Sequence, residues 1–320
     1  MDTEAFSKTV EGGRVSPSLY RDEVDFDEST GYYTPPVEPE TLAGYLAKSG
    51  FHGSIVQARA RILASDYVEN DILDFQSLWS LAMDLVTFGQ CCFQIVRNLL
   101  GQPIRLQHAP MQPMRIGRSG RWCRVTKHND TVWYNDKEIY HVKLYDPNQN
   151  VYGLPDYLSG LEAALLGGEA LTFRRRYYAN GAHLGYILYT TEPNLSPAAE
   201  EKINKSFEAS KGVGNFKSIY VNIPNGHEKG VQVIPIGESK AKDEFEAIKK
   251  VTSQEVMVAH RFPAGLSGIM PLEGSAGLGD PQKYAETYYK TEVRPMQKLL
   301  ESVNRIMPKN KQIRIQRVDG

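Results

Sequence analysis

The chain has 320 residues, enough for two ordinary domains, and its 41% hydrophobic and 23% charged content is typical of a folding protein. The net charge is −1 and the isoelectric point about 6.7, which argues against tight duplex binding, because that needs many Lys and Arg contacts to phosphates. No run approaches eighteen apolar residues, so no membrane span is predicted. The chain starts without a signal-like segment, and its three cysteines, Cys91, Cys92 and Cys123, are too few for a disulfide framework. A reducing, cytosolic place of synthesis is expected.

Residues 1–40 are predicted to form an extended arm, because they are polar, acidic and end near Pro35-Pro36. A disordered tail is the alternative. Residues 41–152 predict a mixed domain, with two short helices broken near Gly50 and Gly53 and an amphipathic helix between Asp74, as N-cap, and Gly89. Short strands separated by turn dipeptides follow and predict an antiparallel meander, over residues 92–96, 114–118, 122–126, 131–134 and 139–144.

Two long helices are predicted, over 153–181 and 239–262, with a small α+β insert, 182–238, between them. They are therefore expected to form an antiparallel pair that carries the insert at its tip. Gly167-Gly168 indicates a break or a close helix contact. The insert predicts strands at 184–189, 218–223 and 231–236, with a helix over 196–211. The second long helix shows one stripe at helical spacing, made of Phe245, Ile248, Val251, Glu255, Ala259 and Phe262.

A glycine-rich loop, 263–281, follows the second long helix, and its small residues include Gly265, Ser267, Gly268, Gly274, Gly277 and Gly279. Asp280 and Pro281 then predict an N-cap and first position of another helix. Within that helix Pro295 lacks the N–H that would bond to Thr291, which predicts a kink. Residues 282–320 are read as this kinked helix followed by one last strand, 312–318.

The residues offer little sign of catalysis. The seven histidines show no metal-ligand spacing, and no lysine follows the glycines at 274–279 as a phosphate-binding loop requires. No catalytic, cofactor or metal site is therefore predicted. Arg174-Arg175-Arg176 is the strongest charge run. A solvated helix face, ion pairs to an adjacent subunit's helix and weak phosphate contacts all stay open for it.

Four motifs in order resemble those of tailed-bacteriophage portal proteins, in particular the PBSX-type branch. They are Ile139-Tyr140-His141-Val142 with Tyr152-Gly153-Leu154-Pro155, Tyr177 to Ala182 with Gly185 to Leu188, Val258 to Pro263, and Thr291 to Met296. Ala264 stands where the family commonly has a second proline. The resemblance covers roughly residues 35–310 and rests on the order and spacing of the motifs together.

The resemblance implies an α+β portal fold in a ring oligomer, usually a dodecamer. It implies a wing at 41–152, stem helices at 153–181 and 239–262, a clip at 182–238 and a tunnel loop at 263–281. The implied function is a non-enzymatic channel at one capsid vertex for DNA packaging and ejection, without a cofactor or a membrane. The implied partners are the major capsid protein, the terminase large subunit, a neck or adaptor protein and double-stranded DNA, with assembly in the host cytoplasm and a final place in the virion.

Individual residues follow from that reading. The tunnel-loop residues are those named above, and weak contact with DNA is expected from Lys240, Lys242 and Lys283. Partner contacts in the clip are expected from Asn194, Glu200, Lys211 and Asn225. Two alternatives remain open. One is another head–tail connector or minor capsid protein, and the other, less favoured, is an enzyme with a glycine-loop nucleotide site.

Overall fold

The computed structural model describes most of the chain, namely residues 24–128, 130–147, 150–179, 186–190, 196–198, 201–202, 205, 219–222, 231–235, 241–267 and 280–317. It divides into two compact units. Unit 1 combines the chain up to Ala164 with the chain from Gln254 onward, and unit 2 is Leu165–Ser253. Unit 1 therefore unites the predicted wing with the last helices, and unit 2 holds the predicted clip with most of both long helices.

Three helices open unit 1: α2 (Pro39–Lys48), α3 (Gly50–Ser65) and α4 (Phe75–Phe88). The break between the first two falls at Ser49, whose hydroxyl caps α3, so Gly53 lies inside the helix. A Cβ on Gly53 would lie 2.2 Å from the carbonyl oxygen of Leu46, and this close approach explains the glycine. The predicted ends of α4 are confirmed, because Asp74 accepts a hydrogen bond from the Ser77 N–H and Gly89 has a φ of 68°.

Two three-stranded antiparallel sheets follow. The first has the order β4-β3-β8 and the second β5-β6-β7. Their strands are β3 (Gln90–Arg97), β4 (Pro103–Ala109), β5 (Met114–Ile116), β6 (Trp122–Val125), β7 (Thr131–Trp133) and β8 (Ile139–Lys143). The predicted single meander is wrong in two ways: it lacks β4, and β3 pairs with β8 across the intervening strands. The first half of β3 is buried throughout, which is typical of a central strand that needs a partner on both sides.

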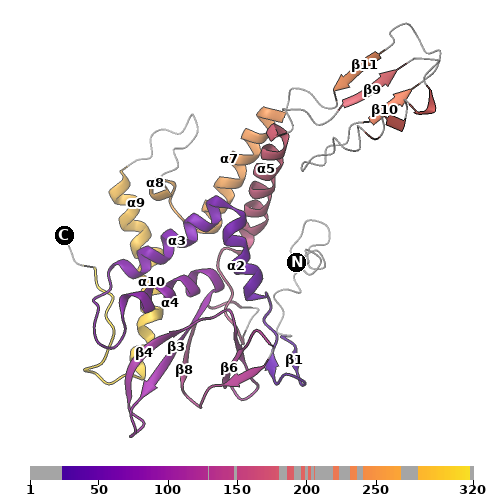
Figure 1. Cartoon of the computed structure of the whole chain (residues 1–320). Helices are drawn as coiled ribbons and strands as arrows, with labels where there is room; N and C mark the ends of the chain where they lie inside the picture. Colours follow the sequence, from indigo (N-terminus) through magenta and orange to yellow (C-terminus); the bar gives the residue numbers. More distant parts are fainter. Residues whose placement is uncertain are drawn as a thin grey trace. The chain divides into compact units, whose positions relative to one another are not determined.

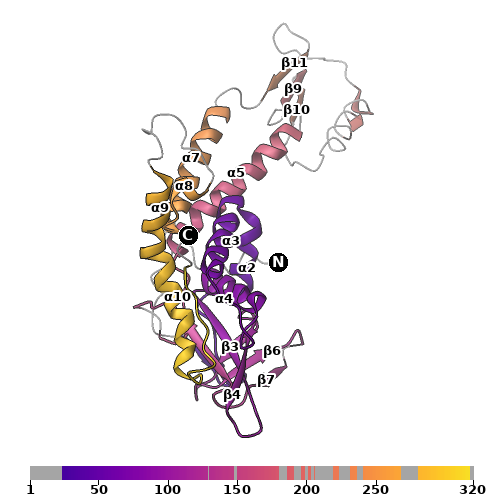
Figure 2. The same cartoon turned by 90° about the vertical axis from the view of Figure 1, so that its left-hand side faces the viewer.

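Helix α4 contacts both the first sheet and α3, and both views place it between them (Figures 1 and 2). The core on this side is apolar and includes the three free cysteines, which are buried. Beside α4, Asp84 accepts hydrogen bonds from His108, 2.7 Å away, and from the backbone N–H of Met111. Burial raises the pKa of Asp84, and the His108 contact opposes that rise.

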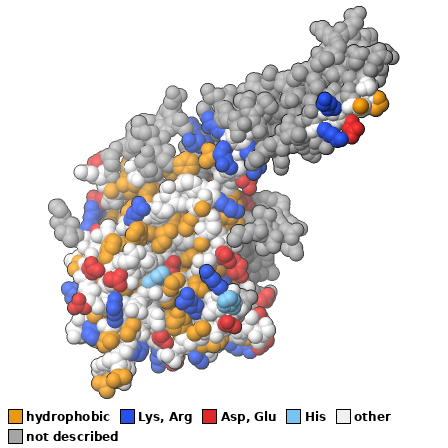
Figure 3. All heavy atoms as spheres, viewed as in Figure 1, with side chains coloured by type: hydrophobic (Ala, Val, Ile, Leu, Met, Phe, Trp, Pro, Cys, Tyr) orange, Lys and Arg blue, Asp and Glu red, His pale blue; other side chains and the backbone are white. Residues whose placement is uncertain are grey.

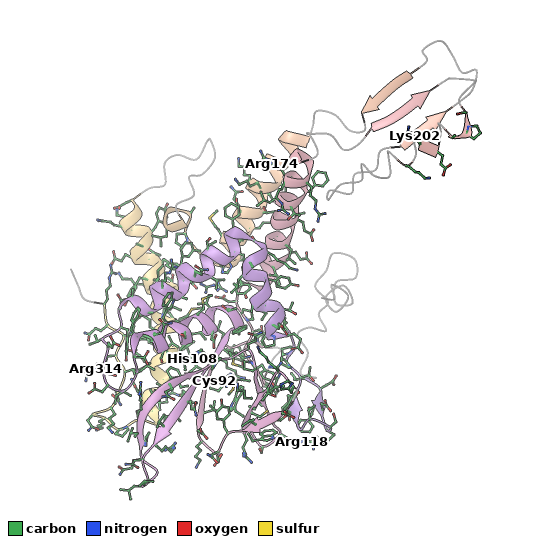
Figure 4. The ribbon with its side chains drawn as sticks, in the orientation of Figure 1. Cys92, His108, Arg118, Arg174, Lys202 and Arg314 are labelled. Atoms are coloured by element: carbon green, nitrogen blue, oxygen red, sulfur yellow. The ribbon has the colours of Figure 1, made fainter. Side chains whose placement is uncertain are left out.

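The described residues before α2 pack against the rest of unit 1. Strands β1 (Phe26–Asp27) and β2 (Tyr32–Tyr33) form a hairpin, and the Tyr152 hydroxyl donates to the Tyr33 carbonyl. Arg118 lies 4.1 Å from the Phe26 ring centroid and 2.6 Å from the Glu28 carboxylate (Figure 4). Residues 26–33 of the expected arm thus form a hairpin, and Tyr33 packs against the apolar cluster of unit 1. Residues 1–23 lie outside the described part.

Unit 2 contains a sheet of order β10-β9-β11, in which β9 is parallel to β10 and antiparallel to β11. Its strands, β9 (Tyr186–Thr190), β10 (Ile219–Asn222) and β11 (Val231–Pro235), confirm the strands predicted in the insert. The predicted helix over 196–211 is described only in part. The long helices are α5 (Leu161–Ala179), which follows the 3₁₀ turn η2 (Leu158–Gly160), and α7 (Ala241–Ala259).

The last part of the chain returns to unit 1. It forms α8 (Ala264–Ser267), α9 (Pro281–Tyr288), the π-helical turn η3 (Tyr289–Val293), α10 (Arg294–Glu301) and the 3₁₀ turn η4 (Ser302–Arg305). The strand predicted over 312–318 is wrong for its described residues. They make one isolated bridge, Tyr67 with Ile315, because side chains of α10 take other backbone groups of this segment: Arg294 donates to the Ile315 carbonyl, and the Ile315 N–H donates to Glu301. Figure 4 labels Arg314 in this segment, where its carbonyl accepts from the Val68 N–H.

Candidate functional site: the helix pair α5–α7 and its base

The two long helices approach each other closely at glycines. A Cβ on Gly160 would lie 2.3 Å from the Cβ of Ala259, and a Cβ on Gly167 would lie 3.1 Å from the Thr252 hydroxyl oxygen. From the first contact to the second, the position moves seven residues forward on one helix, from 160 to 167, and seven residues backward on the other, from 259 to 252. The pair is therefore antiparallel, as predicted. Of the two readings of Gly167-Gly168, the close helix contact is confirmed.

The stripe predicted on α7 does not coincide with its buried face. Val251 is 52% exposed, whereas its neighbours Thr252 and Ser253 are buried. Their hydroxyls donate to backbone carbonyls one turn earlier, Thr252 to Ile248 and Ser253 to Lys250. Small side chains with satisfied hydroxyls permit the close helix approach, whereas Val251 and Val258 stay exposed.

An arginine–aspartate pair lies buried at the base of the helix pair, inside unit 1. Arg59 of α3 donates twice to Asp156, over 2.9 and 2.7 Å, and the two side chains are 2% and 12% exposed. Burial disfavours the charged guanidinium, but the Asp156 carboxylate outweighs it, so the pKa of Arg59 is raised. The two parallel bonds fix α3 to the segment that leads into α5.

Two buried histidines extend this pair. The Arg59 guanidinium lies 3.1 Å from Nδ1 of His260, and Nε2 of His260 lies 2.9 Å from Nδ1 of His52. Since a guanidinium only donates, Nδ1 of His260 accepts, and its proton is on Nε2, which donates to His52. Tyr157 stacks on His260 with ring centroids 4.8 Å apart.

Both histidines are held neutral. Burial, and then the Arg59 charge, lowers the pKa of His52 to about 4. Burial, followed by Arg59 and His52, lowers the pKa of His260 to about 2. Neither imidazole ring is protonated to the charged form at neutral pH. Asp156 is therefore the counterion of Arg59, and His260 is a neutral hydrogen-bond acceptor for it.

Arg261 ends α7 and joins the same cluster. Its φ is 50°, a left-handed conformation that is rare for a residue with a side chain. Its guanidinium lies 3.0 Å from Asp156 and 3.8 Å from Glu292 of the π-helical turn. The next residue, Phe262, packs edge-on against Tyr288 of α9. The cluster thus connects α3, the start of α5, the end of α7 and the last helix.

The last helix changes its hydrogen bonding where the kink was predicted. The Arg294 N–H bonds to the Tyr289 carbonyl, five residues back, and Pro295 follows. A π turn and a proline are both recognised causes of helix bending. Gln297, one turn later, is buried and donates to the Leu63 carbonyl and the Asp66 carboxylate, which anchors α10 to α3.

The residues predicted for the tunnel loop and the clip are placed only in part. Gly265 and Ser267 lie in α8 rather than in an irregular loop, and Lys283 is exposed on α9. Lys242 lies on α7, where the backbone alone is described. The others lie outside the described residues: Gly268, Gly274, Gly277, Gly279, Lys240, Asn194, Glu200, Lys211 and Asn225.

The described face that Figure 3 shows is mixed in charge rather than patterned for one ligand. Figure 3 shows Lys and Arg interspersed with Asp and Glu over the described face. Apolar side chains are exposed at the β3–β4 turn, at Leu99 and Leu100, and on the helix pair, at Leu166, Leu171, Phe173, Val251 and Val258. Among the described residues, no group of three or more His, Cys, Asp or Glu is arranged to hold a metal ion. In the same ranges no helix has the length and hydropathy of a membrane span.

Comparison with known proteins defines the class. A family model described as "Phage portal protein" matches residues 69–306. The chain is 43% identical over 297 residues to a probable portal protein of Haemophilus phage HP1, covering 91% of this chain and 86% of that one. It is 34% identical over 288 residues to a probable portal protein of Escherichia phage P2, covering 89% and 83%. The chain belongs to the phage portal protein family, and the PBSX-type branch stays a prediction.

Solved structures share the fold. A chain from the virion of a native gene transfer agent particle matches with a TM-score of 0.61 at 18% identity, covering 87% of this chain and 83% of that one. The neck of the native particle, obtained with C12 symmetry, matches at 0.58 and 16% identity, covering 89% and 86%. An HK97-family phage portal protein from Corynebacterium diphtheriae matches at 0.57 and 15% identity, covering 85% and 95%.

Proposed function

We propose that this chain assembles into a closed ring whose channel passes double-stranded DNA into and out of a capsid at one vertex. Membership of the portal family carries the proposal, because the family match spans the proposed wing from residue 69 onward, both long helices and the insert between them. The antiparallel pair α5–α7 supplies a rod that a rotational axis can repeat around a channel. Twelve subunits is the proposed number.

The channel is proposed to conduct DNA rather than hold it. Each Lys or Arg contact with a phosphate adds salt-dependent affinity and would retard sliding. A net charge of −1 over 320 residues suits such a channel. Lys240, Lys242 and Lys283 are proposed as weak DNA contacts, and the loop around 268–279 as the segment nearest the DNA. No catalytic role is proposed, since the portal family is structural.

The partners follow the same proposal. The insert between α5 and α7 would contact the terminase large subunit during packaging and a neck or adaptor protein afterwards, with Asn194, Glu200, Lys211 and Asn225 as contacts. The wing would contact the major capsid protein. Assembly would take place in the host cytoplasm, and the finished ring would stay at the portal vertex of the virion.

Native mass spectrometry and negative-stain images of the purified full chain test the ring. The expected result is one species whose mass is a whole multiple of 36.0 kDa, imaged as closed rings with a central hole. Monomers at every concentration, or open filaments, would contradict the proposal. Adding ATP or NAD should leave the melting temperature unchanged, since a nucleotide that bound the native state would raise it.

A further inference from the structure

The helix pair α5–α7 has a fixed register. Gly160 faces Ala259, and Gly167 faces Thr252, so the same register holds over seven residues of each helix. Because the helices are antiparallel, residues after Gly167 on α5 and residues before Thr252 on α7 follow the pair in the same direction. Each residue adds about 1.5 Å along the helix axis. Residues that are equally far from this contact therefore lie at the same height.

Glu169 and Lys250 lie at one height on the two outer edges of the pair. Each is two positions from its contact residue, which is a rotation of about 200°, so each lies on the side of its helix away from the other helix. Both side chains are exposed, and neither has an ion-pair partner in the described part of the chain. The outer edge of α5 thus carries a free carboxylate where the outer edge of α7 carries a free ammonium.

Farther along the pair, the small residues Thr172 and Ala247 are exposed and lie level with each other, each five positions from its contact residue. Opposite charges at one height, with small residues beyond them, make the two edges complementary to each other.

Exposed apolar side chains flank the same edges. Leu166 is 49% exposed on α5, and Val251 is 52% exposed on α7. Each is one position from a contact residue, so each lies between the α5–α7 contact and an outer edge. The two neighbours that cover these edges in a ring would also remove part of the adjoining apolar surface from water, which favours association.

A second copy of the chain fits these edges. A closed ring is built from heterologous contacts and has no rise between subunits, so residues at one height in one subunit meet residues at that height in the next. Resting on the ring proposed above, with the helix pair along its axis, we infer that Glu169 of one subunit pairs with Lys250 of the next. In this seam the outer edge of α5 packs against the neighbour's α7.

Charge exchange in the full chain tests this seam. Glu169→Lys and Lys250→Glu each place like charges together at every interface, so each is expected to lower the fraction of closed rings at low ionic strength by roughly tenfold or more. The double variant Glu169→Lys/Lys250→Glu restores an opposite pair and should recover rings. The readout is the ring fraction by native mass spectrometry, with thermal unfolding to show that each variant folds.

Glu162→Lys is the matched control. Glu162 is exposed on the same edge of α5, but it lies five positions before Gly167 and is therefore level with Met257 instead of a lysine. Its reversal should leave the ring fraction unchanged. Single variants that assemble like the wild type, or a double variant no better than the worse single one, would overturn the inference. A wild-type chain that forms no ring would instead contradict the proposed function.

Discussion

Arg59 is the residue around which the base of the helix pair is arranged. It lies in a buried stripe of α3 that also includes His52, Ile55, Val56 and Leu63. A charged side chain in that position needs a counterion and further acceptors, and Asp156 and His260 supply them. The polar contacts of one helix therefore hold the segment before α5 and the residues after α7 together within unit 1.

Removing Asp156, the counterion of Arg59, should lower the free energy of unfolding strongly. Asp156→Ala leaves the Arg59 charge buried without its carboxylate, and the loss of one partner of a buried pair costs about 3–5 kcal/mol of the free energy of unfolding. Urea unfolding of the full chain measures it. Glu28→Ala removes an ion pair whose two side chains are exposed and should change stability little. Equal effects of the two substitutions would contradict the role given to Arg59.

The buried histidines predict a loss of stability in acid. The folded pKa values of His52 and His260, about 4 and about 2, lie below the ordinary value of 6.5, and burial lowers the pKa of His141 to about 3. As the pH falls, the unfolded chain therefore binds protons on these histidines at a higher pH than the folded chain does. The contribution of the neutral histidines to the free energy of unfolding is complete above pH 6.5. It declines as the pH falls from 6.5 toward the folded pKa values, by about 1.4 kcal/mol per pH unit for each histidine.

Urea unfolding at a series of pH values below 6.5 measures this slope. His52→Gln keeps a polar side chain but removes one titrating group, so its slope should be shallower than that of the wild type. His128 is exposed, and His128→Gln should leave the slope unchanged. A wild-type stability that is flat between neutral pH and pH 5 would contradict the neutral, buried state of these rings.

The buried cluster around Arg59 could be predicted from the sequence only in part, because helical periodicity shows that a polar residue is buried but not which partner it has. His52 and Arg59 are seven positions apart, on the helix face whose other members are apolar, and a polar residue in such a stripe indicates a buried pair. The partner is the harder part. Asp156 lies almost a hundred residues away in the sequence, and only the fold shows that it meets Arg59. His260 and Arg261 belong to one of the recognised motifs, but the motif does not state what they bind.

The long helices depend on close contact at glycine. Gly160→Ala places a methyl group where the Ala259 Cβ already lies, and overpacking of this kind costs about 1–3 kcal/mol. Gly44→Ala is the control, because Gly44 lies in α2 with no atom within 4 Å of the added Cβ. There the better helix propensity of alanine should stabilise the chain by about 0.5–1 kcal/mol. Thermal or urea unfolding compares the two, and a neutral Gly160→Ala would refute the contact.

The segment between α8 and α9 offers a functional test. These two helices lie against each other, so residues 268–279 can be replaced by a short Gly-Ser link without separating them. The ring should still assemble, because the wing and the α5–α7 pair are unchanged, while DNA packaging or DNA retention should be impaired. Negative-stain images and a packaging assay give the two readouts. Loss of the ring in this variant would contradict the proposed place of the segment in the channel.

Elements were predicted better than their pairing. The helix ends at Asp74, Gly89 and Asp280 follow from capping rules that act within a few residues, and the structure confirms them. Pairing of β3 with β8 depends on which strands a central, buried strand recruits, and local patterns do not contain that information. The face of α7 was misjudged for a similar reason, since Thr252 and Ser253 are buried by the approach of α5 rather than by their own hydrophobicity.

Across the whole molecule, a near-neutral chain of the portal family combines the sheets and helices of unit 1 with two long antiparallel helices. The family match covers residues 69–306, so the helix pair, the residues between its helices and most of the described part of unit 1 are matched by the family. What this chain adds is its own side chains at the helix edges and at the buried base. Those side chains determine how copies meet and how firmly the helices are held.

Electron cryomicroscopy of the purified assembly would show whether the helix pair lines a channel. We expect a closed ring with one rotational axis, in which α5 and α7 of every subunit surround a continuous channel and Glu169 approaches Lys250 of the neighbouring subunit. A solitary globule, or an assembly in which these helices lie away from the axis and enclose no channel, would contradict it.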